Sequence, residues 1–223
     1  MGPGPCGRLE IRPVPRLGLY GQGSAGVILA AFGCAATYWL RFVTAAPSWA
    51  GSITKTLSTA LLAVSAYLSG APALLVAGLG FGAAGDFALS RPGKLAFLAG
   101  MAAFAIGHLA YAKLMWTPAN AWQNWPYGLV MLALAASTAI WLIPRTGDLR
   151  WPVAGYVLII TAMALAALTL PGDQTATAVG AGLFLLSDLL LGIHLFVAPR
   201  RSLAYALWPT YWLGQRYILL GSL

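Results

Sequence analysis

The chain is a succession of apolar runs, each about as long as a membrane-spanning helix, separated by short segments that carry Pro, Gly and basic residues. About 20 apolar residues in a helix cross the hydrocarbon core of a bilayer, and a helix satisfies its own backbone hydrogen bonds there. None of the runs shows the period-two alternation of an outer-membrane strand. The pattern therefore predicts an all-α integral membrane protein, a bundle of about eight transmembrane helices. The runs fall at residues 24–41, 53–69, 72–90, 94–114, 125–143, 151–170, 175–197 and 202–222.

Composition excludes the ordinary soluble fold classes. Of the 223 residues, 60% are hydrophobic and only 8% are Asp, Glu, Lys or Arg, against roughly 25% charged residues in a soluble domain. A net charge of +8 would suggest nucleic acid in a soluble protein, but the thirteen basic residues are spread thinly between the apolar runs. We expect membrane lipid and no nucleic acid as partner. Residues 1–23 are expected to be an Arg-, Pro- and Gly-rich polar tail, and residues 24–223 a single transmembrane domain.

The basic residues also bear on orientation. Most of them follow the first, third, fifth and seventh runs, which predicts that these loops are cytoplasmic, while three arginines of the tail favour the opposite orientation. We follow the loops, and we expect a cavity that opens to the cytoplasmic side. The loop residues are Arg41, Arg91, Lys94, Arg145, Arg150, Arg200 and Arg201.

Two of the five acidic residues, Asp86 and Asp188, lie inside apolar runs. A carboxylate in hydrocarbon costs at least about 2.5 kcal/mol on insertion scales, so it normally faces a polar cavity and marks function. A single buried acid can also serve only as a structural hydrogen-bonding group. Two acids in matching contexts favour a paired site.

Part of the sequence around Asp86 recurs, at the same spacing, around Asp188. This similarity is compatible with two parallel four-helix repeats and also with chance in Gly- and Leu-rich sequence. The matched positions are Gly78, Gly80, Asp86 and Leu89 in the first half and Gly180, Gly182, Asp188 and Leu191 in the second.

Other polar side chains lie at helical spacing near the acids. His108 and Tyr111 share one face of the fourth run, and Tyr211 and Gln215 are one turn apart in the eighth. His108 could equally be a core histidine bonded to a backbone carbonyl. Asp86, Asp188 and His108 are too few ligands for a tight metal site, so we expect no metal, and no nucleotide or cofactor motif is present.

Two further polar residues complete the candidate set. Lys55 enters the second run near its start, where it can reach an acid or snorkel toward the headgroups. Ser187 is adjacent to Asp188.

With these motifs in hand, the chain resembles the YhhN-like lysoplasmalogenase family of multi-pass membrane proteins over roughly residues 50–220. Lys55 sits where that family has a lysine in its second span. Three segments look like its signatures: Gly85-Asp86 with Leu89, Phe97, Gly100, Phe104, His108 and Tyr111; Gly180-Ala181 through Phe184, Ser187-Asp188 and Leu191; and Tyr211-Trp212 with Gln215.

The resemblance implies hydrolysis of the vinyl ether bond of lysoplasmalogen, giving a fatty aldehyde and glycerophosphoethanolamine or glycerophosphocholine. Such a bond is cleaved by protonation of its β carbon, attack of water on the resulting oxocarbenium-like cation and collapse of the hemiacetal. Two carboxyls in a low dielectric tend to share one proton, so Asp86 and Asp188 are expected to divide the acid and base roles. The remaining polar residues named above are expected to orient water, carboxyls or substrate.

Basic residues close to Asp86 suggest where the headgroup binds. Arg91 and Lys94 follow Asp86 closely in sequence and are expected to form a rim that binds the lipid phosphate. A proton-coupled transporter and another lipid hydrolase on the same scaffold remain the alternatives, because an acid pair in a helical bundle suits both.

Overall fold

The computed structural model describes residues 17–121 and 123–223, with side chains from residue 25 onward. The regular elements of this part are all helical. Its eight α-helices are α1 (Leu17–Arg41), α2 (Trp49–Leu68), α3 (Ala73–Leu89), α4 (Lys94–Met115), α5 (Trp125–Leu142), α6 (Arg150–Ala167), α7 (Thr175–Phe196) and α8 (Arg201–Gly221). Short 3-10 turns lie at Pro118–Asn120, Ile143–Arg145, Gly147–Leu149 and Gly172–Gln174.

Each predicted run overlaps one of these helices, but two of the helices begin several residues earlier than expected. α1 begins at Leu17, inside the stretch expected to be a polar tail, because no proline interrupts the chain between Pro15 and Pro47. α2 begins at Trp49 rather than at residue 53, because Ser48 caps it by accepting a hydrogen bond from the Gly51 amide at 3.1 Å. Residues 1–16 of the expected tail lie outside the described part of the chain.

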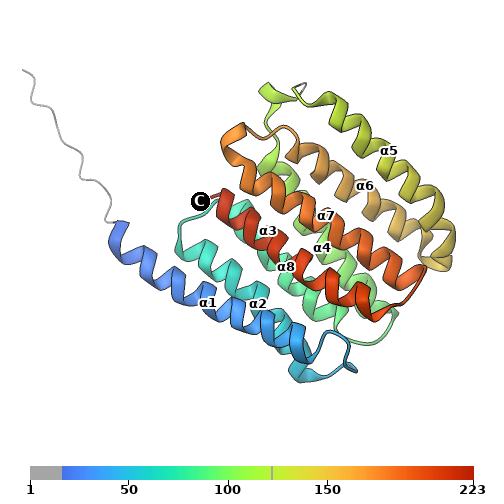
Figure 1. Ribbon diagram of the computed structural model, residues 1–223, viewed down its shortest axis with the longest axis horizontal. Coiled ribbons are helices and arrows are strands. Elements are labelled where there is room, and N and C mark those ends of the chain that lie inside the picture. The colour runs from blue at the N-terminus through green and yellow to red at the C-terminus, as the bar shows by residue number, and fades with distance from the viewer. Residues whose placement is uncertain (1–16, 122) are drawn as a thin grey trace, which may run out of the picture.

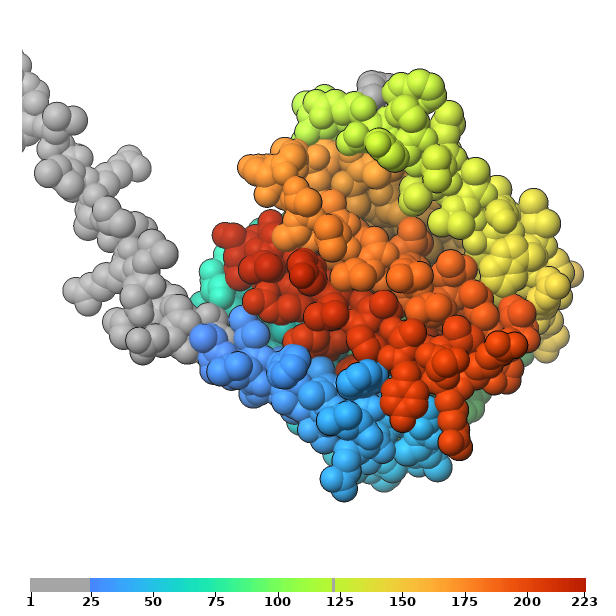
Figure 2. Space-filling view, in the orientation of Figure 1, coloured from blue at the N-terminus to red at the C-terminus, as the bar shows by residue number. Residues whose placement is uncertain are grey.

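The eight helices pack in two layers of four (Figure 1). α2, α3, α4 and α6 are neighbours in one layer, and α1, α8, α7 and α5 are neighbours in the other. The second layer forms the face seen in Figure 2, where α8 and α7 lie between α1 and α5. Contacts of α1 with α2, α2 with α8, and α6 with both α5 and α7 join the layers. The buried polar side chains therefore lie between the two layers of helices.

Glycines allow two helix pairs to approach at backbone distance. A Cβ at Gly107 of α4 would lie 3.1 Å from the carbonyl oxygen of Gly78 in α3. A Cβ at Gly214 of α8 would lie 3.0 Å from the carbonyl oxygen of Gly180 in α7. Small residues at a crossing are typical of closely packed membrane helices. The α3–α4 and α7–α8 pairs thus carry equivalent contacts.

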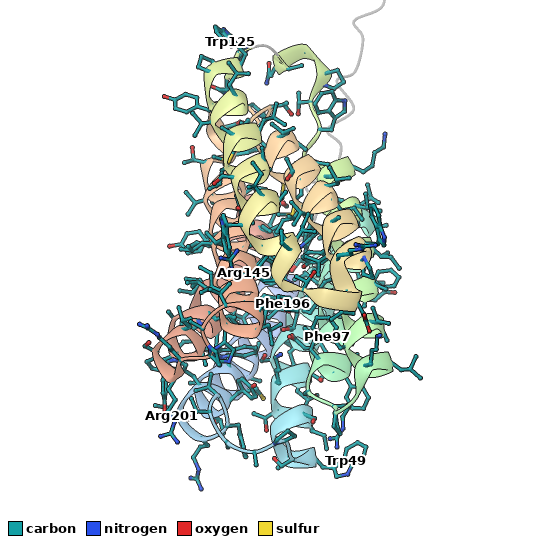
Figure 3. The ribbon with its side chains drawn as sticks, turned by 90° about the vertical axis from the view of Figure 1, so that its right-hand side faces the viewer. Trp49, Phe97, Trp125, Arg145, Phe196 and Arg201 are labelled. Atoms are coloured by element: carbon teal, nitrogen blue, oxygen red, sulfur yellow. The ribbon has the colours of Figure 1, made fainter. Side chains whose placement is uncertain are left out.

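Four segments are long and apolar enough to cross a membrane: Lys94–Met115, Trp125–Arg145, Gly147–Ala167 and Gly172–Phe196. Ala25–Arg41 and Ala73–Leu89 are apolar but shorter. α2 and α8 are less apolar because they carry polar residues such as Lys55, Thr59 and Gln215. Figure 3 shows Trp125 at one end of the molecule and Trp49 and Arg201 at the other.

Candidate active site

Asp86 of α3 is enclosed by side chains from α2 and α8. Lys55 of α2 forms an ion pair with it, with Nζ 3.3 Å from Oδ1. The hydroxyls of Thr59 and Tyr211 both donate to Oδ2 at 2.8 Å. Only 1% of Asp86 is exposed. The carboxylate therefore faces a cation and two hydroxyl donors, and it joins three helices.

Further hydrogen bonds link these side chains to α4. The Gln215 amide nitrogen donates to the Tyr211 hydroxyl at 3.4 Å, and the Tyr111 hydroxyl donates to the Gln215 carbonyl oxygen. Glycines of α3 leave the space for these side chains: a Cβ at Gly82 would lie 2.6 Å from Gln215 Nε2, and one at Gly78 would collide with the Tyr111 ring. We call Asp86 with Lys55, Thr59, Tyr211, Gln215 and Tyr111 the Asp86 cluster.

Asp188 of α7 has different partners, from α4 and α6. Its Oδ2 lies 2.9 Å from His108 Nε2 and accepts a hydrogen bond from the Tyr156 hydroxyl at 3.0 Å. His108 Nε2 and the Tyr156 hydroxyl are 3.1 Å apart. His108 is 1% exposed. These three residues form the Asp188 cluster, in which each side chain comes from a different helix.

An aromatic contact connects the two clusters. The Phe184 ring centroid lies 4.6 Å from that of His108 and 5.2 Å from that of Tyr211. Within the described residues no hydrogen bond or ion pair joins Asp86 to Asp188. The two carboxyls expected to form a pair therefore lie in separate clusters. Asp86 is paired with Lys55 and Asp188 with His108, and Phe184 contacts both clusters.

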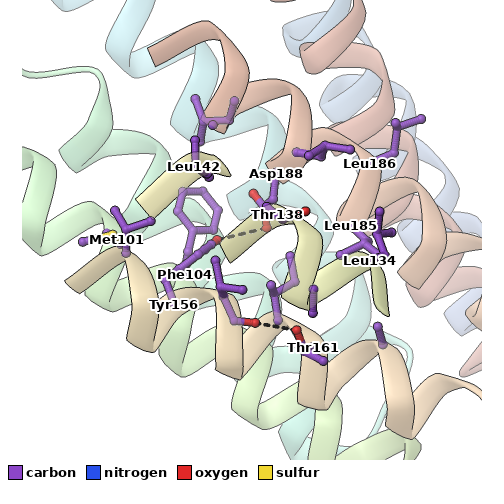
Figure 4. Close-up of a pocket in the computed structure, with 18 of the residues that line it drawn as sticks. Met101, Phe104, Leu134, Thr138, Leu142, Tyr156, Thr161, Leu185, Leu186 and Asp188 are labelled. Atoms are coloured by element: carbon purple, nitrogen blue, oxygen red, sulfur yellow. Dashed lines mark hydrogen bonds between the residues drawn. The ribbon is translucent and has the colours of Figure 1, made fainter. Parts of the chain in front are cut away.

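Asp188 lies on the wall of an apolar cavity of about 240 Å³ (Figure 4). Aliphatic and aromatic side chains of α4, α5, α6 and α7 make most of the wall. The polar residues among those that line it are Asp188, Tyr156, Thr138 and Thr161. Asp86 does not line this cavity. A long apolar chain bound here would lie against one carboxyl and one phenol.

The two residues of the expected phosphate rim point to different partners. Arg91 donates from Nη1 to Ser52 Oγ at 2.9 Å and lies over the Trp49 ring, 4.1 Å from its centroid. Lys94 instead forms an exposed ion pair with Asp148, at 3.4 Å. The two residues expected to form one rim therefore have separate partners: Arg91 contacts α2, and Lys94 contacts the turn before α6.

Among models of known protein families, the one described as the YhhN family matches residues 50–222 of this chain. The chain belongs to the YhhN family. No solved structure matches it significantly.

Three relatives are similar over most of this chain. The lysoplasmalogenase of Mycobacterium tuberculosis (strain CDC 1551 / Oshkosh) is 31% identical over 67% of this chain, which corresponds to only 58% of that relative's length. Lysoplasmalogenase TMEM86A of Bos taurus is 30% identical over 82% of both chains. Lysoplasmalogenase TMEM86B of Homo sapiens is 33% identical over 79% of this chain and 76% of the relative.

In this YhhN family member, most of the residues singled out from the sequence lie in one of the two clusters. Lys55, Tyr111, Tyr211 and Gln215 surround Asp86, and His108 contacts Asp188. Ser187 reaches neither cluster: its hydroxyl donates to the Phe184 carbonyl of its own helix at 2.7 Å. One residue before Asp188, it is rotated by about 100° to another face of α7.

Sequence reasoning missed two members of the clusters. Thr59 follows Lys55 by four residues and so lies on the same face of α2, a spacing that could have identified it. Tyr156 is a phenol inside an apolar run, and its role emerges only from the packing of α6 against α4 and α7. Among the described residues, no three His, Cys, Asp or Glu side chains come together as metal ligands.

Proposed function

We propose that this protein is a membrane-embedded lysoplasmalogenase. It hydrolyses the vinyl ether bond of a lysoplasmalogen to a fatty aldehyde and glycerophosphoethanolamine or glycerophosphocholine. The observation that carries the proposal is the position of Asp188, a carboxyl with a histidine partner on the wall of an apolar cavity. The names of the mycobacterial, bovine and human relatives support the same activity.

In the proposed reaction the alkenyl chain occupies the cavity and its vinyl ether lies at Asp188. The Asp188 carboxyl gives its proton to the β carbon, and the carboxylate that remains faces the oxocarbenium-like cation. Water attacks the α carbon and loses a proton to the Asp188–His108 pair. The hemiacetal then breaks its bond to the glycerol oxygen, which takes up the proton held by the pair. The hemiacetal hydroxyl gives its own proton to the pair as the aldehyde forms, so the pair returns to its starting state.

Asp86 has a different role in this proposal. Because it is enclosed by Lys55 and two hydroxyls and does not line the cavity, we assign it as a positioning residue rather than a group that touches substrate. It holds Tyr211 against Phe184, and Phe184 packs on His108. The acid and base steps thereby pass to the Asp188 cluster alone, without a metal ion.

We also propose that all eight helices cross the membrane. α2 and α8 have 20 and 21 residues, which at 1.5 Å per residue is about 30 Å, the thickness of the hydrocarbon core. The polar side chains of both helices that belong to the Asp86 cluster are turned into the bundle. The basic loops follow the C-terminal ends of α1, α3, α5 and α7, and the positive-inside rule puts these loops on the cytoplasmic side.

The two halves of the chain are proposed to be parallel repeats, with α3 equivalent to α7 and α4 to α8. Gly78 precedes Asp86 by the same eight residues that separate Gly180 from Asp188, and each of these glycines meets a glycine of the next helix. Each acid also contacts one side chain from the helix before its own and one from the last helix of the other half. For Asp86 of α3 these are Lys55 of α2 and Tyr211 of α8, and for Asp188 of α7 they are Tyr156 of α6 and His108 of α4.

The experiment that tests the function uses the purified full-length protein in detergent. Incubation with a lysoplasmalogen should release free aldehyde, and a lysophospholipid with a saturated ether in place of the vinyl ether should release none. A chelator should leave the rate unchanged. Absence of aldehyde from protein that still unfolds cooperatively would refute the proposed activity, and a chelator-sensitive rate restored by zinc would refute the metal-free mechanism.

A further inference from the structure

A second, smaller pocket lies beside the apolar cavity, at the end of the bundle where α1 and α3 end and α2 begins. Its volume is about 150 Å³. The connection between α1 and α2 forms much of its wall, and three of its lining residues are serines: Ser48, Ser52 and Ser90. Unlike the larger cavity, it has a wall of mixed polar and apolar groups and contains no acidic residue.

Arg91 supplies positive charge at this pocket. Arg91 is not itself a lining residue, but its guanidinium donates to Ser52, which lines the pocket, and its Cζ lies 4.1 Å from the centroid of the Trp49 ring. A guanidinium has five N–H donors, so most remain for another acceptor. Within the described residues Arg91 has no carboxylate partner, whereas Lys94 is paired with Asp148. Arginine held on an aromatic ring with free donors is well suited to bind phosphate.

The smaller pocket and the larger cavity share one lining residue, Leu89 of α3. Leu89 follows Asp86 by about one helical turn, so the shared wall lies close to Asp86 along α3. A lipid whose chain lies in the larger cavity therefore has a polar pocket next to it, because Leu89 lines both.

We propose that this pocket binds the phosphate of the substrate headgroup through Arg91, with Ser52 positioning the guanidinium. The proposal rests on the proposed function for the identity of the lipid. It adds to that function a headgroup site distinct from the chain cavity. The sequence suggested that Arg91 and Lys94 bind the phosphate together, whereas this proposal assigns that role to Arg91 alone.

The test measures equilibrium binding, which does not depend on turnover. The probes are a lysophospholipid with a saturated ether, which cannot be cleaved by the proposed reaction, and the alkylglycerol of the same chain length, which lacks the phosphate. Arg91→Gln should weaken binding of the phospholipid at least about tenfold, as expected for loss of a charge-assisted hydrogen bond, and leave binding of the alkylglycerol unchanged. Ser52→Ala should show the same selective loss to a smaller extent.

Arg150→Gln is the matched control. Arg150 also lies over a tryptophan, Trp151, at 5.4 Å, but within the described residues its side chain has no hydrogen bond to a residue that lines the pocket. It should leave the affinity for both probes unchanged. Equal weakening of both probes by Arg91→Gln, or an equal effect of Arg150→Gln, would overturn the proposal.

Inorganic phosphate distinguishes a lipid headgroup from a free anion. Millimolar phosphate should displace the phospholipid only weakly from the wild-type protein, whereas glycerophosphoethanolamine should displace it more strongly. If inorganic phosphate competes as well as the glycerophosphodiester, the pocket is a free-phosphate site and the assignment to a headgroup is wrong. If the phospholipid binds as proposed but aldehyde is never released, the headgroup site stands and the proposed function fails.

Discussion

At the scale of single residues, the two buried acids differ in what would remain after each is replaced. Asp86 balances the charge of Lys55, whose ammonium also lies 5.7 Å from the Trp208 ring centroid and has little access to water. Asp188 has a histidine and a phenol as partners and lies on the wall of a cavity that a substrate can fill. Loss of Asp86 should therefore act mainly on stability, and loss of Asp188 mainly on chemistry.

The first prediction concerns the ion pair. Asp86→Asn leaves a buried ammonium without its carboxylate, which typically destabilises a protein by about 3–5 kcal/mol. The double variant Lys55→Met with Asp86→Leu removes both charges and should recover much of that loss. Thermal unfolding of the purified proteins in detergent measures both effects. A double variant less stable than Asp86→Asn would show that the pair is not a compensated buried charge.

The second prediction concerns the length of the bound chain. Gly182 lines the cavity about 9 Å along α7 from Asp188, and a Cβ there meets nothing within 4 Å. Gly182→Phe should therefore fill that end of the cavity without displacing backbone. It should reduce turnover of long alkenyl chains several-fold more than turnover of short ones.

The control for this substitution is Gly80→Phe. Gly80 is the corresponding glycine of α3, also open at Cβ but away from the cavity. It should leave the chain-length profile unchanged. The same profile for wild type and Gly182→Phe would mean that the chain does not extend towards that end.

At the scale of helices, the approach of α7 to α8 depends on the absence of a side chain at their crossing. A Cβ at Gly180 would lie 2.6 Å from the backbone nitrogen of Ile218 and 2.7 Å from the carbonyl oxygen of Gly214. Neither backbone atom can move aside without shifting the whole helix. Since Tyr211 of α8 binds Asp86 and Asp188 lies on α7, a shift would disturb both clusters.

The third prediction follows from this crossing. Gly180→Ala should lower stability by about 1–3 kcal/mol, the usual cost of overpacking, and should lower activity with it. Gly33→Ala in α1, where a Cβ meets nothing within 4 Å, should be neutral or slightly stabilising because alanine favours helix. Unfolding midpoints and aldehyde release measured on both variants test the prediction. Equal midpoints for the two would show that α7 and α8 tolerate separation.

At the scale of the whole molecule, the number and approximate limits of the helices follow from the sequence because each run has the length of a membrane span. The order of the helices in the two layers does not follow, because α4, α5, α6 and α7 are apolar on all sides and their sequences do not mark which face meets which neighbour. The packing of α4 against α6, which brings His108 to Tyr156, is a product of that hidden order.

The candidate site shows the same division. Asp86, Asp188 and His108 stand out because charged or polar groups in apolar runs are costly. Their distribution over two clusters could not be predicted, because helical spacing relates residues within a helix but not between helices. Tyr156 was missed for that reason, and Lys94 was placed beside Arg91 although its partner, Asp148, lies in another loop.

The rate of aldehyde release by Asp188→Asn tests the central claim most directly, namely that the carboxyl on the cavity wall performs the acid and base steps. An amide can neither donate the proton nor carry the charge, so kcat on lysoplasmalogen should fall at least about 100-fold. Binding of the uncleavable saturated ether and the unfolding midpoint should stay close to wild type, and Asp173→Asn in a loop should leave the rate unchanged. A kcat near wild type for Asp188→Asn would contradict the account.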